Sequence, residues 1–333
     1  MTLAALLVAA FLAALGGTFA ARRYALRMRL LDEPGARRSH SVATPRGGGI
    51  AIAGTWLLAW CLMSMMLDTP WVLAASVAGG VALVGGIGWM DDHRHVAPRD
   101  RLAVHAVAAA WLALAVWQVG APAWCALVAL VAVLVLVNVW NFMDGIDGLA
   151  ASQAAIAASA YAWLGEGPGL VAAAAVLAAA ALGFLPLNAP RARIFMGDVG
   201  SGTLGYVLAV LFTLSMVESR TAPAHWPVLL LPISAFLIDS SLTLLRRMVK
   251  RERWWTPHVT HAYQRLASHA GRHWPVSAGY GVWSVCVTLV GVGMWSSPPA
   301  LTMGLLVGCC VTGALVWRWS GGLAADSTDV MDE

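Results

Sequence analysis

"TLAALLVAAFLAALGGTFA", residues 2–20, contains no charged side chain and is long enough to cross the hydrocarbon core of a bilayer as one helix. Basic residues follow this stretch, whereas a secretory signal peptide has them before its apolar segment, so we interpret it as a retained span. The whole chain has the same character, since 59% of its 333 residues are hydrophobic and 11% are charged. A soluble domain cannot bury that much apolar surface around one core, which predicts an integral membrane protein.

Apolar segments of similar length recur along the chain, and they suit helices because a backbone in lipid must satisfy its own hydrogen bonds. We therefore predict an all-α polytopic membrane protein with about eleven transmembrane helices. Their centres lie near residues 11, 57, 80, 110, 131, 157, 178, 209, 236, 286 and 308. The spans form one membrane domain, residues 1–319, and we expect residues 320–333 to be a short, disordered cytoplasmic tail.

The basic residues indicate the orientation of these spans, because cytoplasmic loops are enriched in Lys and Arg. Of the 21 basic residues, 20 fall on one predicted side and Arg220 alone falls on the other. This distribution predicts a periplasmic N-terminus, a cytoplasmic C-terminus and an odd number of spans. The net charge of +4 follows from the same bias and does not indicate nucleic-acid binding. The five cysteines have no framework spacing, so we expect no disulfide scaffold.

Five acidic residues fall at cytoplasmic ends of the predicted spans or in the loops beside them. They are Asp91, Asp92, Asp144, Asp147 and Asp198. A solvated loop would explain any one of them, but five carboxylates among Gly, Asn and apolar residues need a balancing cation. Asp91 and Asp92 are adjacent, so on a helix their side chains point about 100° apart and we expect different roles for them.

A second polar feature interrupts an otherwise apolar segment, NVWNFMDGIDGLAAS, residues 138–152. Asn138, Asn141, Asp144 and Asp147 recur every third residue there, so on a helix or a 3₁₀ turn they would form one polar stripe. Such a stripe requires a polar partner at the membrane surface.

The segment RIFMGDVGSGTLG, residues 193–205, places Asp198 just before a predicted span. Free N–H groups and the helix dipole favour an anion such as phosphate at that position, so a carboxylate there needs a cation. Mg²⁺ is commonly held by one or two carboxylates together with substrate phosphates and waters. Zinc is disfavoured, because no Cys or His cluster has ligand spacing on a suitable scaffold.

The most basic loop contains HVTHAYQR, residues 258–265, in which His258 and His261 are three residues apart. Such a pair alone is more often a surface feature, but the surrounding cations favour anion binding. These cations are Arg246, Arg247, Lys250, Arg251, Arg253 and Arg265. Two features stay open: TPRGGG at 44–49 either loosens a helix start or binds an anion, and Asp239 either supports the structure or functions.

Four of these segments, in this order on one side, give the chain a resemblance to a known family. They are MDD at the end of a span, NVWNFMDGIDGLA, NAPRARIFMGDVGS and HVTHAYQR. Together they resemble the polyprenyl-phosphate N-acetylhexosamine-1-phosphate transferases of glycosyltransferase family 4, over the region from LLDEPGARRSHSVATPRGGG through residue 265. Enzymes of this family transfer a phospho-sugar from a UDP-sugar to undecaprenyl phosphate and release UMP, at the cytoplasmic face of the bacterial inner membrane.

The resemblance implies several partners and a role for each matching residue. The partners would be the lipid bilayer, undecaprenyl phosphate, a UDP-amino sugar and Mg²⁺, with Mn²⁺ as an alternative ion and a homodimer as an allowed assembly. The catalytic residues would be Asp91, Asp92 and Asp144, and the metal ligands would be Asp198 and Asn141. Gly145, Asp147 and Asn188 would hold the uridine part, and His258 and His261 would contact the pyrophosphate or the sugar.

Two departures from the family pattern bear on the branch. Arg94 and His95 stand where many members have Lys, which leaves the source of cationic help for the phosphates open. The last loop reads His-x-x-His, unlike the contiguous histidines of the peptidoglycan enzyme that transfers phospho-N-acetylmuramoyl-pentapeptide. This difference favours the branch that initiates O-antigen, lipopolysaccharide or related envelope glycans. The peptidoglycan enzyme and a membrane transporter stay as alternatives, although a transporter would place its acids near the midplane and often has two related halves.

Overall fold

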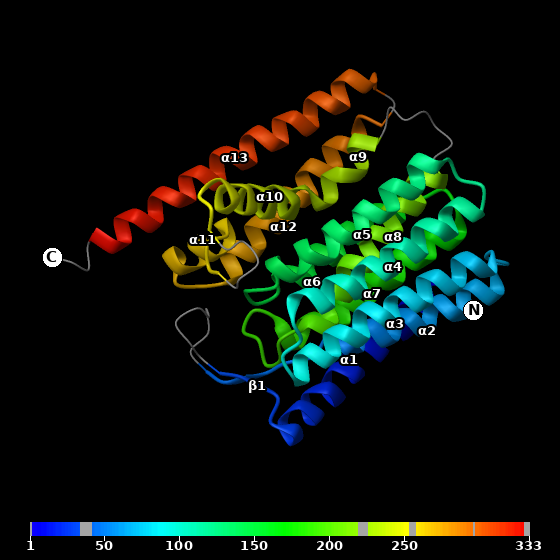
Figure 1. The fold of residues 1–333 in the computed structure, drawn as a ribbon, viewed down its shortest axis with the longest axis horizontal. Coiled ribbons are helices and arrows are strands. Elements are labelled where there is room, and N and C mark those ends of the chain that lie inside the picture. The colour runs from blue at the N-terminus through cyan, green and yellow to red at the C-terminus, as the bar shows by residue number, and fades with distance from the viewer. Residues whose placement is uncertain (1, 34–41, 219–225, 253–257, 296, 330–333) are drawn as a thin grey trace.

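The protein is described here by a computed structural model, which covers residues 2–33, 42–218, 226–252, 258–295 and 297–329, with side chains to residue 323. The described chain is an assembly of long helices with one small two-stranded sheet (Figure 1). The helices are α1 Leu3–Met28, α2 Ile50–Met66, α3 Trp71–His93, α4 Pro98–Gln118, α5 Ala123–Met143, α6 Leu149–Leu164, α7 Pro168–Asn188, α8 Asp198–Glu218, α9 Trp226–Leu230, α10 Ser234–Val249, α11 Ala262–Ala270, α12 Trp274–Gly293 and α13 Pro299–Asp329.

The helices confirm the predicted all-α polytopic membrane fold. In the described part of the chain, nine helical segments are long and apolar enough to cross a membrane, counting α9, the 3₁₀ turn η2 (Leu231–Ile233) and α10 as one. Helices α2 and α6 are apolar but shorter, at 17 and 16 residues. Each of the eleven predicted centres lies within one of these segments. The number of actual spans and the side on which each terminus lies stay predictions.

Helix α8 is the centre of the assembly. Every side chain from Val199 to Met216 is buried, as expected for a helix that is surrounded by other helices rather than amphipathic. It packs closely against α3 and α5 (Figure 1). Glycines allow this approach: a Cβ at Gly205 would collide with the carbonyl oxygen of Leu136 on α5. The Tyr206 hydroxyl also donates to the carbonyl oxygen of Ser76 on α3 at 3.1 Å.

One membrane segment is interrupted by η2, which contains Pro232 and separates α9 from α10. A proline lacks the N–H that would continue the α-helical pattern and clashes with the preceding turn, so the helix changes geometry there. The break sets the start of α10, on which Asp239 lies in a buried position. This segment therefore carries a buried carboxylate towards the loops of the predicted site.

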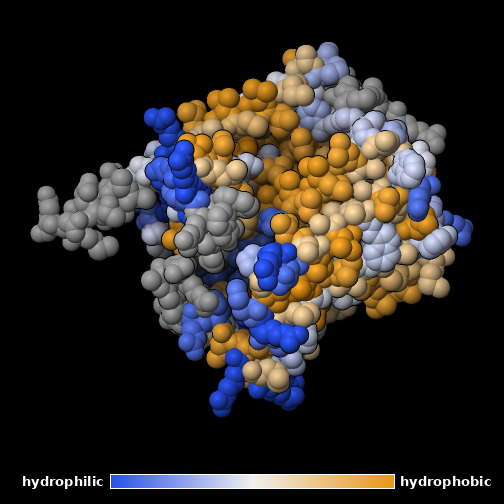
Figure 2. Space-filling model, in the orientation of Figure 1, coloured by the Kyte–Doolittle hydropathy of each residue, from blue (hydrophilic) through white to orange (hydrophobic). Residues whose placement is uncertain are grey.

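The predicted site residues all lie near one end of the helical assembly. Helix α1 begins at the opposite end, and α13 ends at the site end (Figure 1). Hydrophilic residues are concentrated on that side in the space-filling view, and hydrophobic residues cover much of the remaining face (Figure 2). The connection from α1 to α2 at this end contains strands β1 (Leu31–Asp32) and β2 (Thr44–Pro45), which pair antiparallel.

The expected disorder from residue 320 is wrong for the first part of the tail, because α13 continues to Asp329. Ser320 is buried, and its hydroxyl accepts hydrogen bonds from Arg265 Nε at 3.2 Å and Nη2 at 2.9 Å. The residue composition near the end of the sequence did not reveal this contact, which holds α13 to α11.

We expect Gly205→Ala to destabilise the protein by about 1–3 kcal/mol, because the new methyl group meets the rigid backbone of α5. Thermal unfolding in detergent would measure the loss. Gly86→Ala is the matched control: it also lies inside a long helix, α3, but its Cβ would have no neighbour within 4 Å. Equal unfolding midpoints for the two variants would contradict the close packing of α5 and α8.

Candidate active site

The last turn of α3 directs its two aspartates to different partners. Asp91 Oδ1 accepts a hydrogen bond from the backbone N–H of Val96 at 2.7 Å, and Asp91 Oδ2 pairs with Arg101 at 2.8 Å. The carboxylate of Asp92 points instead to the start of α8, where it accepts from the N–H groups of Asp198 at 3.0 Å and Val199 at 3.2 Å. Adjacent positions on one helix therefore supply two carboxylates with different surroundings.

Asp92 is buried and acts as a helix cap from another helix. Two free N–H groups and the positive end of the α8 dipole stabilise a carboxylate at that position. The guanidinium of Arg46 donates to the backbone carbonyls of Asp92 at 2.6 Å and Asp91 at 3.4 Å, which fixes the end of α3. Both oxygens of the Asp92 carboxylate are thus engaged with the backbone of α8.

The TPRGGG segment holds the loop before Asp198. Gly48 N–H donates to the carbonyl oxygen of Phe195 at 2.9 Å, and Gly49 N–H donates to that of Met196 at 2.8 Å. A Cβ at Gly49 would collide with Gly200, so only glycine permits this approach of the two backbones. In the described structure these N–H groups bind protein carbonyls, so the contacts support close packing and not the anion-binding alternative.

Arg101, in the first two turns of α4, joins two of the predicted acids. Its Nη1 atom forms an ion pair with Asp91 and a second, short one with Asp198. The sequence interpretation did not single out Arg101, and looked for cationic help at Arg94 and His95, which are exposed. The PRDRL segment places Arg101 at the start of a helix, one loop after the two aspartates. Chain spacing alone does not indicate which way the Arg101 side chain points.

The predicted stripe from residue 138 to 147 is broken, because α5 ends at Met143. Asn138 and Asn141 lie on the helix, where Asn138 Nδ2 donates to Leu134 O at 2.7 Å and Asn141 Nδ2 donates to Ser201 Oγ at 3.3 Å. The glycine-containing turn that follows sends Asp144 and Asp147 elsewhere. The four polar side chains therefore do not share one helix face.

Asp144 directly follows α5 and lies within electrostatic reach of Asp92. Burial, and then the negative charge of Asp92, raise the pKa of the Asp144 carboxyl to about 7. A carboxyl with a pKa near the working pH can both accept and release a proton. Gly145, the next residue, packs against the hydroxyl of Tyr263.

Asp147 and Asn188 connect loops on the other side of this turn. Asp147 Oδ2 accepts from Ala192 N–H at 3.1 Å and lies 3.3 Å from His273 Nδ1. Asn188 is buried; its side chain accepts from Gly148 N–H at 3.0 Å and donates to Ile194 O at 3.1 Å. Sequence analysis did not identify His273, because it lies 126 residues from Asp147 with no motif around it.

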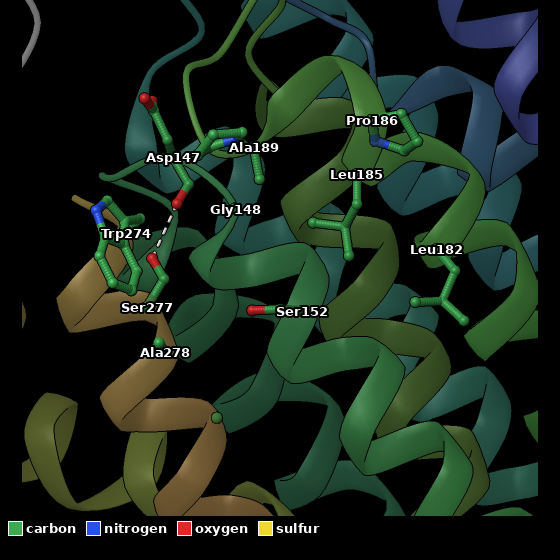
Figure 3. Close-up of a pocket in the computed structure, with 12 residues that line it drawn as sticks. Asp147, Gly148, Ser152, Leu182, Leu185, Pro186, Ala189, Trp274, Ser277 and Ala278 are labelled. Atoms are coloured by element: carbon green, nitrogen blue, oxygen red, sulfur yellow. Dashed lines mark hydrogen bonds between the residues drawn. The ribbon is translucent and has the colours of Figure 1, made fainter.

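A largely apolar cavity of about 520 Å³ opens beside Asp147, between α6, α7 and α12. Figure 3 shows Asp147, Trp274 and Ser277 at one end, with the Ser277 hydroxyl donating to the carbonyl oxygen of Asp147 at 2.8 Å. Leu182 and Leu185 line the part of the cavity along α7. The cavity therefore adjoins the Asp147 turn, and its lining offers few polar groups.

His258 and His261 lie close together, with ring centroids 4.9 Å apart. Burial, followed by the proximity of His261 and Arg247, lowers the pKa of His258 to about 4, so this imidazole is neutral near pH 7. The hydroxyl of Thr260 is 3.0 Å from His258 Nδ1. His261 is buried and stacks near Phe142, with centroids 6.1 Å apart, which brings the basic loop to the end of α5.

The oxygen donors at the start of α8 fit a hard divalent cation. Asp91 and Asp198 both reach one cationic group, the guanidinium of Arg101, so their carboxylates converge on a single position. Asn141 uses its amide nitrogen on Ser201, which leaves its carbonyl oxygen as an acceptor. Among the described residues, no cluster of three or more His, Cys, Asp or Glu side chains is arranged for a metal. Mg²⁺ binds oxygen ligands such as carboxylates, so the chemistry of Asp91, Asp198 and Asn141 fits this ion.

Comparison with known proteins points to one family. The family model described as "Glycosyl transferase family 4" matches residues 74–216, a region that contains the five aspartates of the predicted site and most of α8. Over these residues the chain is similar to glycosyl transferase family 4. The region matched in this family model stops before His258 and His261.

Three curated relatives show the extent of the likeness to known proteins. A Bacillus subtilis protein, "Probable undecaprenyl-phosphate N-acetylglucosaminyl 1-phosphate transferase", is 27% identical over 76% of this chain and 74% of its own length. A Thermotoga maritima protein, "Undecaprenyl-phosphate alpha-N-acetylglucosaminyl 1-phosphate transferase", is 27% identical over 75% and 77%. A Mycobacterium tuberculosis protein, "Decaprenyl-phosphate N-acetylglucosaminephosphotransferase", is 32% identical over 41% and 36%.

We expect Asp144 to make stability depend on pH. Its folded-state pKa is raised, so its contribution is present below the ordinary carboxyl pKa and is lost as pH rises through about 7. Unfolding midpoints measured between about pH 5 and about pH 8 should fall more steeply in the wild type than in Asp144→Asn. Asp100→Asn, which removes an exposed carboxylate, is the control. Parallel curves for the wild type and Asp144→Asn would refute the shifted pKa.

We expect Arg101→Gln to lower the free energy of unfolding by about 1–3 kcal/mol in Mg²⁺-free buffer, because it leaves two partly buried carboxylates without their shared cation. Arg99→Gln, two residues away, removes an exposed guanidinium and serves as the control. Chemical or thermal unfolding in detergent measures both. No difference between the two variants would mean that Arg101 does not neutralise this pair.

Proposed function

We propose that the chain transfers an N-acetylhexosamine 1-phosphate from a UDP-sugar to undecaprenyl phosphate, releasing UMP and forming a polyprenyl-diphosphate-linked amino sugar. The observation that carries this proposal is the convergence of Asp91 and Asp198 on one cationic position at the N-terminus of the central helix α8. Such a position suits the joining of two phosphate-bearing substrates, whose charges must be screened before they can approach. The names of the relatives support the same reaction, since each name refers to a polyprenyl phosphate and to N-acetylglucosamine phosphate transfer.

Asp198 and Asn141 would hold Mg²⁺, and Mn²⁺ would use the same oxygen ligands. The bound ion would screen the phosphates and stabilise the charge that develops on them. Arg101 already contacts both carboxylates, so it is the nearest protein cation for substrate phosphates. Arg101 would thus provide the positive charge for the phosphates whose source the replacement of the family Lys by Arg94 and His95 left open.

The contacts separate the three candidate catalytic aspartates. Asp92 has both carboxylate oxygens on α8 N–H groups, which favours a role in holding the loop over direct attack. Asp91 and Asp144 are then the acids available to orient the acceptor phosphate or to take its residual proton, and the pKa of Asp144 near 7 suits proton exchange. A phosphate monoester has a second pKa of about 6, so little proton remains to be removed near pH 7.

We favour a direct transfer. A phosphate oxygen of undecaprenyl phosphate attacks the β-phosphorus of the UDP-sugar, the new P–O bond forms, and the bond to the bridging oxygen breaks so that UMP leaves with that oxygen. A two-step route would first place the phospho-sugar on an aspartate. Radiolabelled UDP-sugar that left phospho-sugar on the protein without lipid would favour the two-step route.

The other residues would bind the UDP-sugar. Gly145 and Asp147 lie in the turn proposed for the uridine part, and Asn188 contacts it from the end of α7. The backbone contacts of Asp147 and Asn188 keep that turn fixed. His258 and His261 would face the pyrophosphate or the sugar. Because the unliganded His258 is neutral, it would act as a hydrogen-bonding group and leave the positive charge to arginines.

We place the reaction at the cytoplasmic face of the bacterial inner membrane, in the initiation of O-antigen, lipopolysaccharide or a related envelope glycan. The basic loops support that face, and the His-x-x-His segment supports that branch. The relatives named for N-acetylglucosamine make this sugar the first donor to test, ahead of phospho-N-acetylmuramoyl-pentapeptide. A transporter is disfavoured, because the acids lie at the ends of α3 and α5 and at the start of α8 and not near the middle of these helices.

The test is transfer of labelled phospho-sugar to undecaprenyl phosphate in detergent, with UMP release measured in parallel. UDP-N-acetylglucosamine is compared with UDP-N-acetylfucosamine and UDP-N-acetylquinovosamine. We expect product from one donor only when Mg²⁺ and the lipid are both present, and a loss of about 100-fold or more in Asp198→Asn. Asp100→Asn, an exposed acid outside the site, is the control. UMP release that needs no lipid, or full activity of Asp198→Asn, would contradict the proposal.

A further inference from the structure

Asp239 lies on α10 with its carboxylate almost fully buried, at 3% exposure. Four donors surround it: the N–H groups of Ala262 at 2.8 Å and Tyr263 at 3.1 Å, and the hydroxyls of Tyr280 at 2.7 Å and Thr243 at 3.2 Å. Burying a charge is costly unless it is paired or hydrogen-bonded, so this set of donors is what makes the position tolerable. The carboxylate thereby fixes the N-terminus of α11 to α10 and α12.

His261 directly precedes α11 and is packed onto the same carboxylate. Its Nδ1 atom lies 3.5 Å from Asp239 Oδ1, and the side chains of the two residues are 2% and 3% exposed. The imidazole is flanked by the rings of Phe142, His258 and Tyr263. A ring held between neighbours and facing a fixed carboxylate has a defined orientation, with Nδ1 towards Asp239.

The same element reaches the Asp144 turn. The hydroxyl of Tyr263 donates to the carbonyl oxygen of Phe142 at 3.0 Å and contacts Gly145. Burial, Asp239 and Asp144 raise the pKa of Tyr263 well above its ordinary value, so the hydroxyl keeps its proton and remains a donor. Asp239 therefore lies directly beside His261, and it reaches the turn that follows α5 through Tyr263.

We propose that Asp239 is a positioning residue for the UDP-sugar side of the site, which acts by orienting His261 and by fixing α11 against the Gly145 turn. The inference deepens the proposed function and rests on it. The hydrogen bonds that the structure shows for Asp239 go to α10, α11 and α12 and not to Asp91 or Asp198, so we expect its substitution to act mainly on the UDP-sugar. In this respect Asp239 differs from Asp198, which is only partly buried and pairs with Arg101.

The experiment compares four proteins: wild type, Asp239→Asn, His261→Gln and the double variant. We expect Asp239→Asn to raise KM for UDP-N-acetylglucosamine, or for whichever UDP-sugar the wild type uses, by about 10- to 100-fold, with KM for undecaprenyl phosphate within about twofold of wild type. The double variant should lose less than the product of the two single losses, because both substitutions act in part on the same imidazole. A merely structural role would raise KM for both substrates. The loss in the double variant would then equal the product of the two single losses.

Two further variants keep the result interpretable. Tyr280→Phe removes one donor from Asp239, and should give a smaller rise in the same KM if Asp239→Asn does not fold. Glu218→Gln is the matched control: its carboxylate also accepts from a backbone N–H, that of Gly167 at 2.9 Å, but at the far end of α8. We expect its KM values to equal those of the wild type.

The outcomes distinguish this inference from the proposed function. A wild type that transfers no phospho-sugar from any UDP-amino sugar overturns the proposed function and this inference with it. An active wild type whose Asp239→Asn and Tyr280→Phe variants keep normal KM for the donor overturns the positioning role alone. Equal rises in KM for both substrates, or multiplying losses in the double variant, overturn it as well.

Discussion

The carboxylate of Asp92 on the first two N–H groups of α8 is the contact on which the rest of the site depends. Helix α8 is buried along its length, so the position of its first residue is set from inside the assembly and not by solvent. Asp92 ties that residue to α3, and the glycines before α2 bring a third backbone against the same loop. Contacts from α3 and from the segment before α2 therefore fix the position of Asp198 at the start of α8.

This constraint separates two parts of the site with different chemistry. Asp91, Asp198 and Arg101 form a charged part, in which the balance between carboxylates and a cation is what matters. Asp239 and His261 form a buried part with aromatic neighbours, in which orientation is what matters. Asp144 links the two parts electrostatically. The negative charge of Asp92 contributes to the raised pKa of Asp144, and Asp144 contributes to the raised pKa of Tyr263.

Much of the fold could be predicted from the sequence, because the length and polarity of a membrane helix are written in consecutive residues. The acids at span ends could be found for the same reason, and so could the different surroundings of Asp91 and Asp92, which follow from the helical rotation between neighbours. The stripe from Asn138 to Asp147 failed, since it assumed that one helix continued through Gly145.

The missed residues share a different property. Arg101, His273 and the contacts of Asp239 depend on how separate helices pack, and chain spacing carries no information on that packing. Asn188 could be identified through resemblance, but its bonds to Gly148 and Ile194 needed the fold. Ser320 was expected in a disordered tail because a Gly- and Asp-bearing end looks like one, whereas its contact with Arg265 lies 55 residues away.

The attachment of α13 bears on how the protein is made. Arg265 holds Trp317 and Ser320, and the Trp317 indole donates to Thr243, which in turn donates to Asp239. Synthesis proceeds from the N-terminus, so the charged part of the site is translated long before α13. A nascent chain therefore acquires its acidic cluster early, and the contacts that support Asp239 and His261 from α13 form only after that helix has been made.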